Sequence, residues 1–245
     1  MPVQEFNARL LEMKDYTNEG ELIVRVMKFS TEKAKDFSYK PGQFVMISVD
    51  NVMSPTDQTK LKQSAMSIAS APHEKGYIEL CIKMHDKPGV SKYIKDKVKA
   101  GGEITVKGPF GVFGLVESQE QAVFVSTGTG IAPLMSMARH LVNAKFSKPV
   151  KFFYGCRRKE NFLYGKELQQ FAKSMKNFEL NVICSRENFN GRQGHVQELL
   201  KGYKFKGNIG GTHAYVCGNP QAVEEIISAL KETGLKAENI HKEQW

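Results

Sequence analysis

Residues 122–133 read AVFVSTGTGIAP, an apolar run that leads directly into a glycine-rich turn and then into a segment with helical spacing. Three more short apolar runs follow at 150–155, 179–185 and 214–218, with helical stretches between them. Runs of this kind are typical of parallel strands that are covered on both faces. The alternation of strands and helices therefore predicts an open α/β domain with right-handed crossovers.

Several helix boundaries and connections can also be predicted. Asn219 is the expected N-cap of the last helix, Pro220 lies in its first turn, and Gly234 follows its end. The polar segment 50–63 is expected to be a mobile loop, and 90–98 a short amphipathic helix.

The first half of the chain follows a different pattern. In YIELCIKM, at 77–84, apolar side chains alternate with a set that includes Glu79 and Cys81. A period of two predicts antiparallel strands with one buried face and one wetter face. The sequence thus predicts two domains, an antiparallel β-domain at 1–116 and an α/β domain at 117–245.

The chain of 245 residues has a formal net charge of +9, which favours an acidic partner by steering its approach. Nucleic acid is the weaker alternative because the lysines are dispersed and no nucleic-acid motif occurs, and solvated charge without a partner is a third. No run approaches the roughly 18 apolar residues of a membrane span. The N-terminal segment lacks the apolar stretch of a secretory signal, so we expect a cytoplasmic protein.

The four cysteines are isolated and far apart, without a C-x-x-C pair or an iron–sulfur spacing. They are Cys81, Cys156, Cys184 and Cys217. We expect no metal site, and we expect at least three of them to be small buried residues in strands.

The turn at Thr127–Gly130 has the composition of a pyrophosphate site. Its glycines permit close approach of the backbone, and the helix that begins near Pro133 offers N–H groups at its N-terminus. The spacing is G-x-G-x-x-P, however, and a strand-to-helix turn without a ligand is the alternative. Ser185, Arg186 and Arg192 follow a later strand and would suit an extra phosphate on an adenosine ribose. Solvated arginines on a loop are the alternative there.

Nine segments, taken in order, resemble the ferredoxin–NADP reductase family in the broad sense that includes cytochrome b5 reductase-like and related flavin reductases. They are PGQF at 41–44, SAMSIASAP at 64–72, GVS at 89–91, KGPFGVF at 107–113, TGTGIAP at 127–133, YGCRRKENFLYGKEL at 154–168, CSRE at 184–187, CGNP at 217–220 and the terminal EQW. The resemblance covers almost the whole chain. It implies a six-stranded antiparallel flavin-binding barrel followed by a nucleotide-binding α/β domain with a parallel sheet.

The resemblance departs from the family in the flavin-binding segment, which reads R-x-Y-S in the family. Ser67 matches the serine near the redox-active ring nitrogen. Ser64 replaces the arginine that pairs with the flavin phosphates, and Met66 replaces the tyrosine that packs on the ring, as a methionine sulfur can also do. Lys62 or Lys83 is a candidate for the missing charge. The choice between FAD and FMN is open at this point.

The resemblance implies cofactor-binding positions in both domains. In the first domain they are Ser64, Ala65, Met66, Ser67, Ile82, Lys83, Gly89, Val90 and Ser91. In the second they are Thr127, Gly128, Thr129, Gly130, Pro133, Arg157, Ser185, Arg186, Arg192, Cys217, Gly218 and Trp245.

Four residues are implied to act in the chemistry, in which nicotinamide C4 and flavin N5 exchange a hydride in stacked rings. Ser67 would bond near N5, and Cys217 would lie beside the nicotinamide. Glu243 would relay protons or place the nicotinamide. Trp245 would cover the flavin and yield to the nicotinamide, with a frayed terminus as the alternative.

The implied function is that of a flavin-dependent oxidoreductase with FAD and NADP, or possible NAD, as its cofactors. It would pass electrons between NADPH and a one-electron acceptor protein such as ferredoxin or flavodoxin. One alternative is an NADH-linked reductase of the cytochrome b5, flavin or quinone kind. Another is an electron-transfer subunit of a larger complex.

Overall fold

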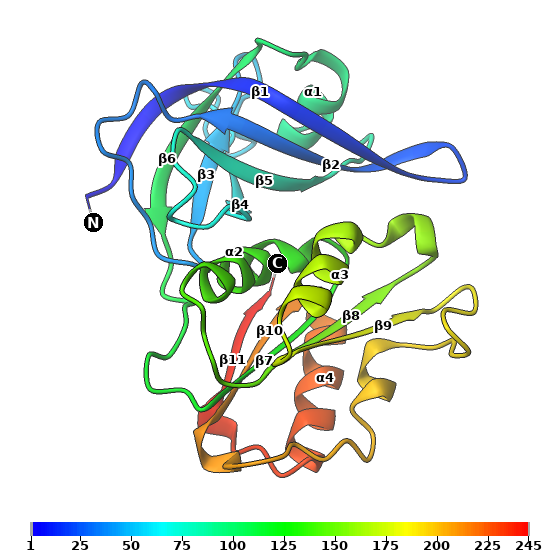
Figure 1. The fold of residues 1–245 in the computed structure, drawn as a ribbon. Helices are drawn as coiled ribbons and strands as arrows, with labels where there is room; N and C mark the ends of the chain where they lie inside the picture. The colour runs from blue at the N-terminus through cyan, green and yellow to red at the C-terminus, as the bar shows by residue number, and fades with distance from the viewer. Residues whose placement is uncertain (1, 245) are drawn as a thin grey trace. The chain divides into compact units, whose positions relative to one another are not determined.

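The computed structural model describes residues 2–244, and these form two compact units (Figure 1). One comprises Met1–Gly114 with Met135–His140, and the other comprises Leu115–Leu134 with Leu141–Trp245. None of the described helices is long and apolar enough to cross a bilayer.

The first unit is a six-stranded antiparallel barrel. Its elements are β1 (Gln4–Asn18), β2 (Glu21–Ser30), β3 (Phe44–Ser48), β4 (Ser64–Ser67), β5 (Tyr77–Lys83), α1 (Val90–Lys97) and β6 (Glu103–Phe110). The strand order is β4-β3-β6-β1-β2-β5, and every paired strand is antiparallel. An antiparallel bridge between Ile68 and Leu80 joins the two ends of this sheet. The implied barrel is confirmed.

The alternation predicted for β5 is only partly correct. Glu79 and Cys81 are buried along with the apolar residues between them, although a wetter face was expected. The Glu79 carboxylate is accommodated inside because Arg139 donates to it at 2.8 Å. Ser70 also accepts a hydrogen bond from the Glu79 N–H at 2.9 Å. A buried carboxylate needs a partner such as Arg139, and the period of two does not reveal it.

The segment 50–63, expected to be a mobile loop, is folded as a short hairpin. Met53 and Leu61 form an antiparallel bridge, and the Lys62 N–H donates to the Val52 carbonyl at 2.7 Å. Backbone hydrogen bonds therefore fix the position from which the Lys62 side chain extends.

The second unit contains a parallel five-stranded sheet with the order β11-β10-β7-β8-β9. Its strands are β7 (Gln121–Thr127), β8 (Val150–Cys156), β9 (Phe178–Cys184), β10 (Thr212–Gly218) and β11 (Ile240–Gln244). Its helices are α2 (Ile131–Asn143), α3 (Gly165–Ser174) and α4 (Pro220–Glu232). Short 3-10 turns lie at Gly128–Gly130, Lys159–Asn161, Val196–Leu199, Ile209–Gly211 and Ala237–Asn239.

Helices α3 and α4 cover opposite faces of this sheet (Figure 1). Phe171 of α3 packs edge-on against Phe178 of β9, whereas Val223 of α4 belongs to the core that includes Val125. Helix α4 has the predicted cap, because Asn219 Oδ1 accepts from the Ala222 N–H at 3.0 Å. The four predicted strands are present, and β11 is an additional edge strand.

Two histidines join β10 to this edge strand. His213 Nδ1 and His241 Nε2 are 3.0 Å apart, and their rings are stacked with centroids 5.3 Å apart. The His241 ring also stacks on Tyr215, with centroids 5.0 Å apart. Burial lowers the pKa of both imidazoles, and for His241 the neighbouring His213 lowers it further. One ring must stay unprotonated to accept the shared hydrogen bond.

We expect acid to destabilise this edge of the sheet. Both pKa values are lower in the folded than in the unfolded chain, so the unfolded chain binds more protons as the pH falls below neutrality. The thermal midpoint should therefore decrease between pH 7.5 and 5.5. The thermal midpoint should decrease less in the double variant His213→Gln/His241→Gln, because glutamine has no imidazole to titrate. Replacing the exposed His85 with Gln is the control, and an equal slope in all three proteins would contradict the prediction.

Candidate functional site

The glycine-rich turn connects the central strand β7 to α2. Thr127 ends the strand, and Gly128 has a positive φ of 53° with open space where a side chain would begin. Gly128 is exposed, and Pro133 lies in the first turn of α2, where its missing N–H costs no helical bond. The turn therefore offers backbone to a ligand at the carboxyl edge of the sheet.

Two predicted nucleotide-binding segments interlock at this edge. A Cβ at Gly130 would lie 2.4 Å from the Cys217 carbonyl oxygen, so only glycine fits. A Cβ at Gly218 would likewise lie 2.8 Å from Thr127 Oγ1. The structure thus brings the Thr127–Gly130 turn against the end of β10.

The strand register adds Glu243 to this group. Cys217 of β10 lies opposite Glu243 of β11 on one side and opposite Ser126 of β7 on the other. Cys217 is fully buried. Ser126 Oγ is also buried, and no hydrogen-bond partner for it occurs among residues 2–244. No sequence signal pointed to Ser126, which precedes the recognised turn. Trp245 lies outside the described residues.

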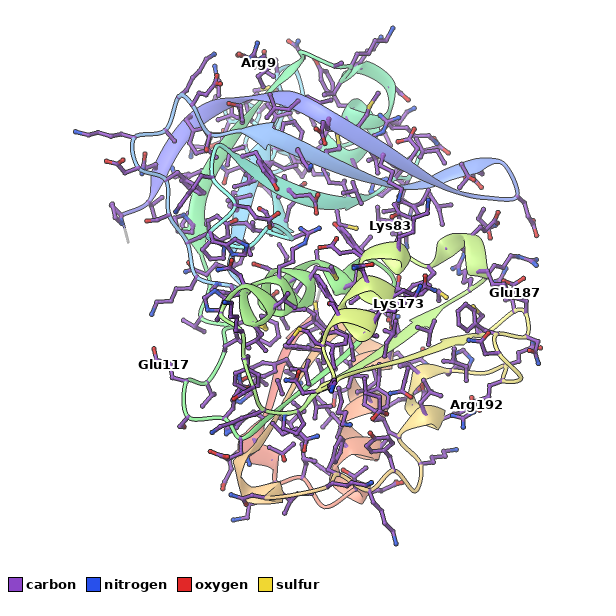
Figure 2. The ribbon with its side chains drawn as sticks, in the orientation of Figure 1. Arg9, Lys83, Glu117, Lys173, Glu187 and Arg192 are labelled. Atoms are coloured by element: carbon purple, nitrogen blue, oxygen red, sulfur yellow. The ribbon has the colours of Figure 1, made fainter. Side chains whose placement is uncertain are left out.

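The predicted arginines lie at the ends of β8 and β9. Pairing continues past both strands, because the Ser185 N–H donates to the Cys156 carbonyl at 3.0 Å and the Arg186 N–H to the Arg157 carbonyl at 2.9 Å. Arg192 follows a tight turn in which Asn190 and Gly191 have positive φ. Figure 2 shows Arg192 on the loop that follows β9.

All three guanidinium groups, those of Arg157, Arg186 and Arg192, are exposed. Within the described chain, none of them has a carboxylate at ion-pair distance. Glu187, also labelled in Figure 2, accepts a hydrogen bond from the Lys159 N–H. This edge is therefore positively charged and suited to an anionic ligand.

The first unit has a candidate anion site at the start of α1. Gly89, the N-cap, has a φ of 153°, no side chain caps the helix, and its first turn has no acidic residue. The Ser91 hydroxyl donates to the Lys83 carbonyl and so fastens α1 to β5. Val90 is buried beside it. Lys83 itself is exposed at the end of β5 (Figure 2).

Lys62 extends from its hairpin to this helix end. A Cβ at Gly89 would lie 3.1 Å from Lys62 Nζ, so the ammonium group lies against the N-cap. In the part of the chain that the structure describes, no carboxylate pairs with it. The helix N-terminus and an ammonium group together fit the negative charge of a flavin diphosphate.

Strand β4 carries the departures from the R-x-Y-S pattern. Ser67 is buried and lies opposite Phe44, whereas Ala65 is exposed. Met66 is half-buried and packs against the core of the barrel, so only part of its side chain is left for a flavin ring. Ser64 is half-buried, and Ile82 is fully buried in the core, where it lies opposite Arg25 of β2.

Comparison with known proteins now identifies the domains. Residues 18–114 match the oxidoreductase FAD-binding domain, and residues 124–228 match the oxidoreductase NAD-binding domain. The chain belongs to the ferredoxin–NADP reductase-like family. Its two domains match the FAD-binding and NAD-binding domains of oxidoreductases.

The names of relatives that match most of the chain include a hydroxylase protein, a monooxygenase reductase and a quinone reductase. The chain is 28% identical over 249 residues to the phenol hydroxylase P5 protein of Acinetobacter pittii, covering 99% of this chain and 66% of that protein. It is 30% identical to the glycine betaine monooxygenase reductase subunit of Pseudomonas aeruginosa, covering 91% and 60%. It is 29% identical to one subunit of the Na⁺-translocating NADH-quinone reductase of Idiomarina loihiensis, covering 85% and 55%. The chain thus spans 55% to 66% of the length of these relatives.

Solved structures share the fold. The FAD/NAD-binding domain of nitric oxide dioxygenase from Vibrio cholerae has a TM-score of 0.82, 20% identity and 98% coverage of both chains. A ferredoxin–NADP⁺ reductase from Neisseria gonorrhoeae with bound FAD and NADP has a TM-score of 0.78, 18% identity and 98% coverage of both chains.

We expect Gly130→Ala to disrupt the second unit. The added methyl group would overlap the backbone of Cys217, which cannot move as a side chain can, and should cost about 2–3 kcal/mol. Gly128→Ala is the matched control, because its methyl group meets open space and only the positive φ costs about 1 kcal/mol. Urea unfolding measures both. Equal losses would show that the close approach at Gly130 is not required.

Proposed function

We propose that the protein passes electrons between NADPH and a one-electron acceptor protein through bound FAD. The observation that carries this proposal is the group formed by Cys217, Glu243 and the Thr127–Gly130 turn at the carboxyl edge of the sheet. It lies in the nucleotide-binding domain that follows the FAD-binding domain. We propose 1–116 and 117–245 as the limits of these domains.

FAD, when bound, supplies the flavin N5 that exchanges a hydride with nicotinamide C4 and releases electrons singly. The residues of this chain would position the flavin and the nicotinamide and shield them from water. The Thr127–Gly130 backbone holds the pyrophosphate, and the buried Cys217 forms a wall beside the nicotinamide. Glu243, which lies opposite Cys217, would hold or move a proton beside the nicotinamide. Ser67 would donate a hydrogen bond near N5.

On the flavin side, we propose that Lys62 replaces the family's arginine. Ser64 offers no positive charge, whereas Lys62 places an ammonium group against Gly89, where α1 presents unpaired N–H groups. Val90 and Ser91 complete this helix end. Ala65 and the exposed part of Met66 would contact the flavin, and the backbone of Ile82 and Lys83 would offer it hydrogen bonds. Two phosphates in FAD use this charge better than the single phosphate of FMN.

Lys62→Ala should weaken FAD binding by roughly 10-fold or more, since a charge-assisted bond to phosphate is lost. Titration of the apoprotein with FAD and with FMN, followed by flavin fluorescence, measures both dissociation constants, and the preference for FAD should shrink. Lys60→Ala is the control, because Lys60 is exposed on the same hairpin and pairs with Asp57. If the two variants bind FAD equally, Lys62 has no role in the site.

On the nucleotide side, we propose that Ser185, Arg186 and Arg192 bind the 2′-phosphate of NADPH. This proposal is supported by the guanidinium groups of Arg186 and Arg192, which are exposed and form no ion pair within the described residues. Arg157, held beside Arg186 by the backbone bond, lines the same edge. Gly218 and Pro133 allow the rest of the dinucleotide to approach. The name of the Idiomarina loihiensis relative includes NADH, so NADH is the alternative donor.

Arg186→Ala should lower the ratio of kcat/KM for NADPH to that for NADH by about 10- to 100-fold, because NADH lacks the phosphate that the guanidinium group binds. Stopped-flow reduction of the flavin with each dinucleotide gives the ratio. Lys173→Ala, an exposed change in the last turn of α3 (Figure 2), should leave it unchanged. A wild-type preference for NADH would contradict this assignment.

A second candidate function is an electron-transfer subunit of a multicomponent system. It is favoured by the names of the relatives, which include reductase subunits of monooxygenases. For both candidate functions the net charge of +9 supports an acidic electron carrier as partner, and we propose a cytoplasmic location.

The acceptor can be tested directly. Electron transfer to an acidic ferredoxin or flavodoxin should be fast at low salt and should slow steeply as ionic strength rises, because steering is screened. Transfer to a neutral quinone or to riboflavin, neither of which carries a charge, should not depend on salt. Turnover with quinone or free flavin alone would overturn the carrier-protein proposal in favour of the flavin or quinone reductase alternative.

A further inference from the structure

Two cysteines lie side by side at the carboxyl edge of the parallel sheet. Cys156 ends β8, Cys184 ends β9, and the two residues are direct partners in the strand register. Their Sγ atoms are 3.1 Å apart. Both side chains therefore point to the same face of the sheet, and the four cysteines are all in the thiol form.

The backbone around this pair is fixed on both sides. The Ser185 N–H donates to the Cys156 carbonyl, and the next bond joins Arg186 to Arg157. Cys156 Sγ also lies 3.7 Å from the Ile183 carbonyl. These bonds hold the two strand ends together, and the 3.1 Å between the sulfur atoms is about 1 Å longer than the roughly 2.05 Å of a disulfide bond.

The two thiols differ in access. Cys184 is 0% exposed, whereas Cys156 is partly exposed. A small oxidant can therefore reach Cys156 first, and Cys184 can then attack from its buried position without meeting solvent.

We propose that Cys156 and Cys184 are a reversible dithiol–disulfide site that reacts with a small disulfide such as oxidised glutathione. The Cys156 thiolate attacks one glutathione sulfur, forms a mixed disulfide and releases one glutathione thiolate. The Cys184 thiolate then attacks Cys156 Sγ and releases the second glutathione. Two cysteine thiols are oxidised, two glutathione thiols form, and both protons pass to the products.

The environment makes this reaction slow at neutral pH. Burial raises the pKa of both thiols, and for Cys156 the hydrogen bond with Cys184 raises it further. Since the thiolate is the nucleophile, the rate of oxidation should increase with pH. The site is thus suited to a sustained change of redox poise rather than to rapid turnover.

The two cysteines lie next to residues that we propose bind the dinucleotide, so a link between thiol oxidation and dinucleotide binding rests on the proposed function. Arg157 directly follows Cys156, and Ser185 and Arg186 directly follow Cys184. A dinucleotide bound to these residues would cover the accessible side of Cys156. Bound NADP⁺ should therefore slow disulfide formation several-fold.

The test uses the full chain incubated with oxidised glutathione, with and without saturating NADP⁺. Remaining thiols are alkylated after denaturation and counted by mass spectrometry, and peptide mapping locates the link. We expect two of the four thiols to be lost together, as a Cys156–Cys184 link that dithiothreitol reverses. Cys184→Ala should stop at the mixed disulfide on Cys156, and Cys81→Ala should behave as the wild type.

The outcomes separate the two claims. Four thiols that remain free at high pH, or a link that involves Cys81 or Cys217, would overturn the disulfide. A link that forms at the same rate with NADP⁺, when a separate titration shows that NADP⁺ is bound, would overturn the coupling. If the titration shows no NADP⁺ binding, the proposed function fails, while the thiol count still decides whether the disulfide forms.

Discussion

The end of β10 and the turn after β7 meet backbone to backbone, at a distance that leaves no room for a Cβ on Gly130. Neighbouring parallel strands that are joined only by hydrogen bonds have room for side chains at this point. Here the absence of a side chain lets the turn fold over the end of the neighbouring strand. Cys217, Gly218 and the Thr127–Gly130 turn consequently occupy one place, and the register of β11 adds Glu243. The site that we propose in the second domain depends on this contact.

In the first domain, we propose that the flavin diphosphate is bound without the arginine that the family uses. The proposed site combines the uncapped N-terminus of α1 with Lys62, which comes from a separate hairpin. Lys62 comes from the 50–63 segment rather than from β4, so the charge is supplied across space and not at the same sequence position. We propose that this arrangement compensates for Ser64, which offers no positive charge.

Much of the fold is predictable from local patterns. The apolar runs predicted four of the five parallel strands, because strands buried on both faces have few polar residues. Strand β11 has the polar sequence IHKEQ and lies at an edge, where apolar patterning is weak. The α4 cap was predictable because Asn219 bonds within its own turn. The burial of Glu79 was not, because its partner Arg139 is 60 residues away.

The candidate site divides in the same way. Motif positions such as Thr127–Gly130 could be predicted from the sequence, because glycine indicates a backbone conformation or a close approach that other residues do not allow. The placement of Lys62 against Gly89 and the contact of Cys156 with Cys184 depend on tertiary register. No spacing in the sequence indicates either. Interactions between distant segments are therefore where the structure contributes most to the understanding of function.

The proposed function depends above all on whether the barrel holds FAD although the arginine of the family is missing. The most direct test is to purify the protein, record its visible spectrum, denature it and identify the released flavin by chromatography. We predict one equivalent of FAD per chain. Release of FMN, or a protein that stays colourless after incubation with FAD, would contradict this prediction.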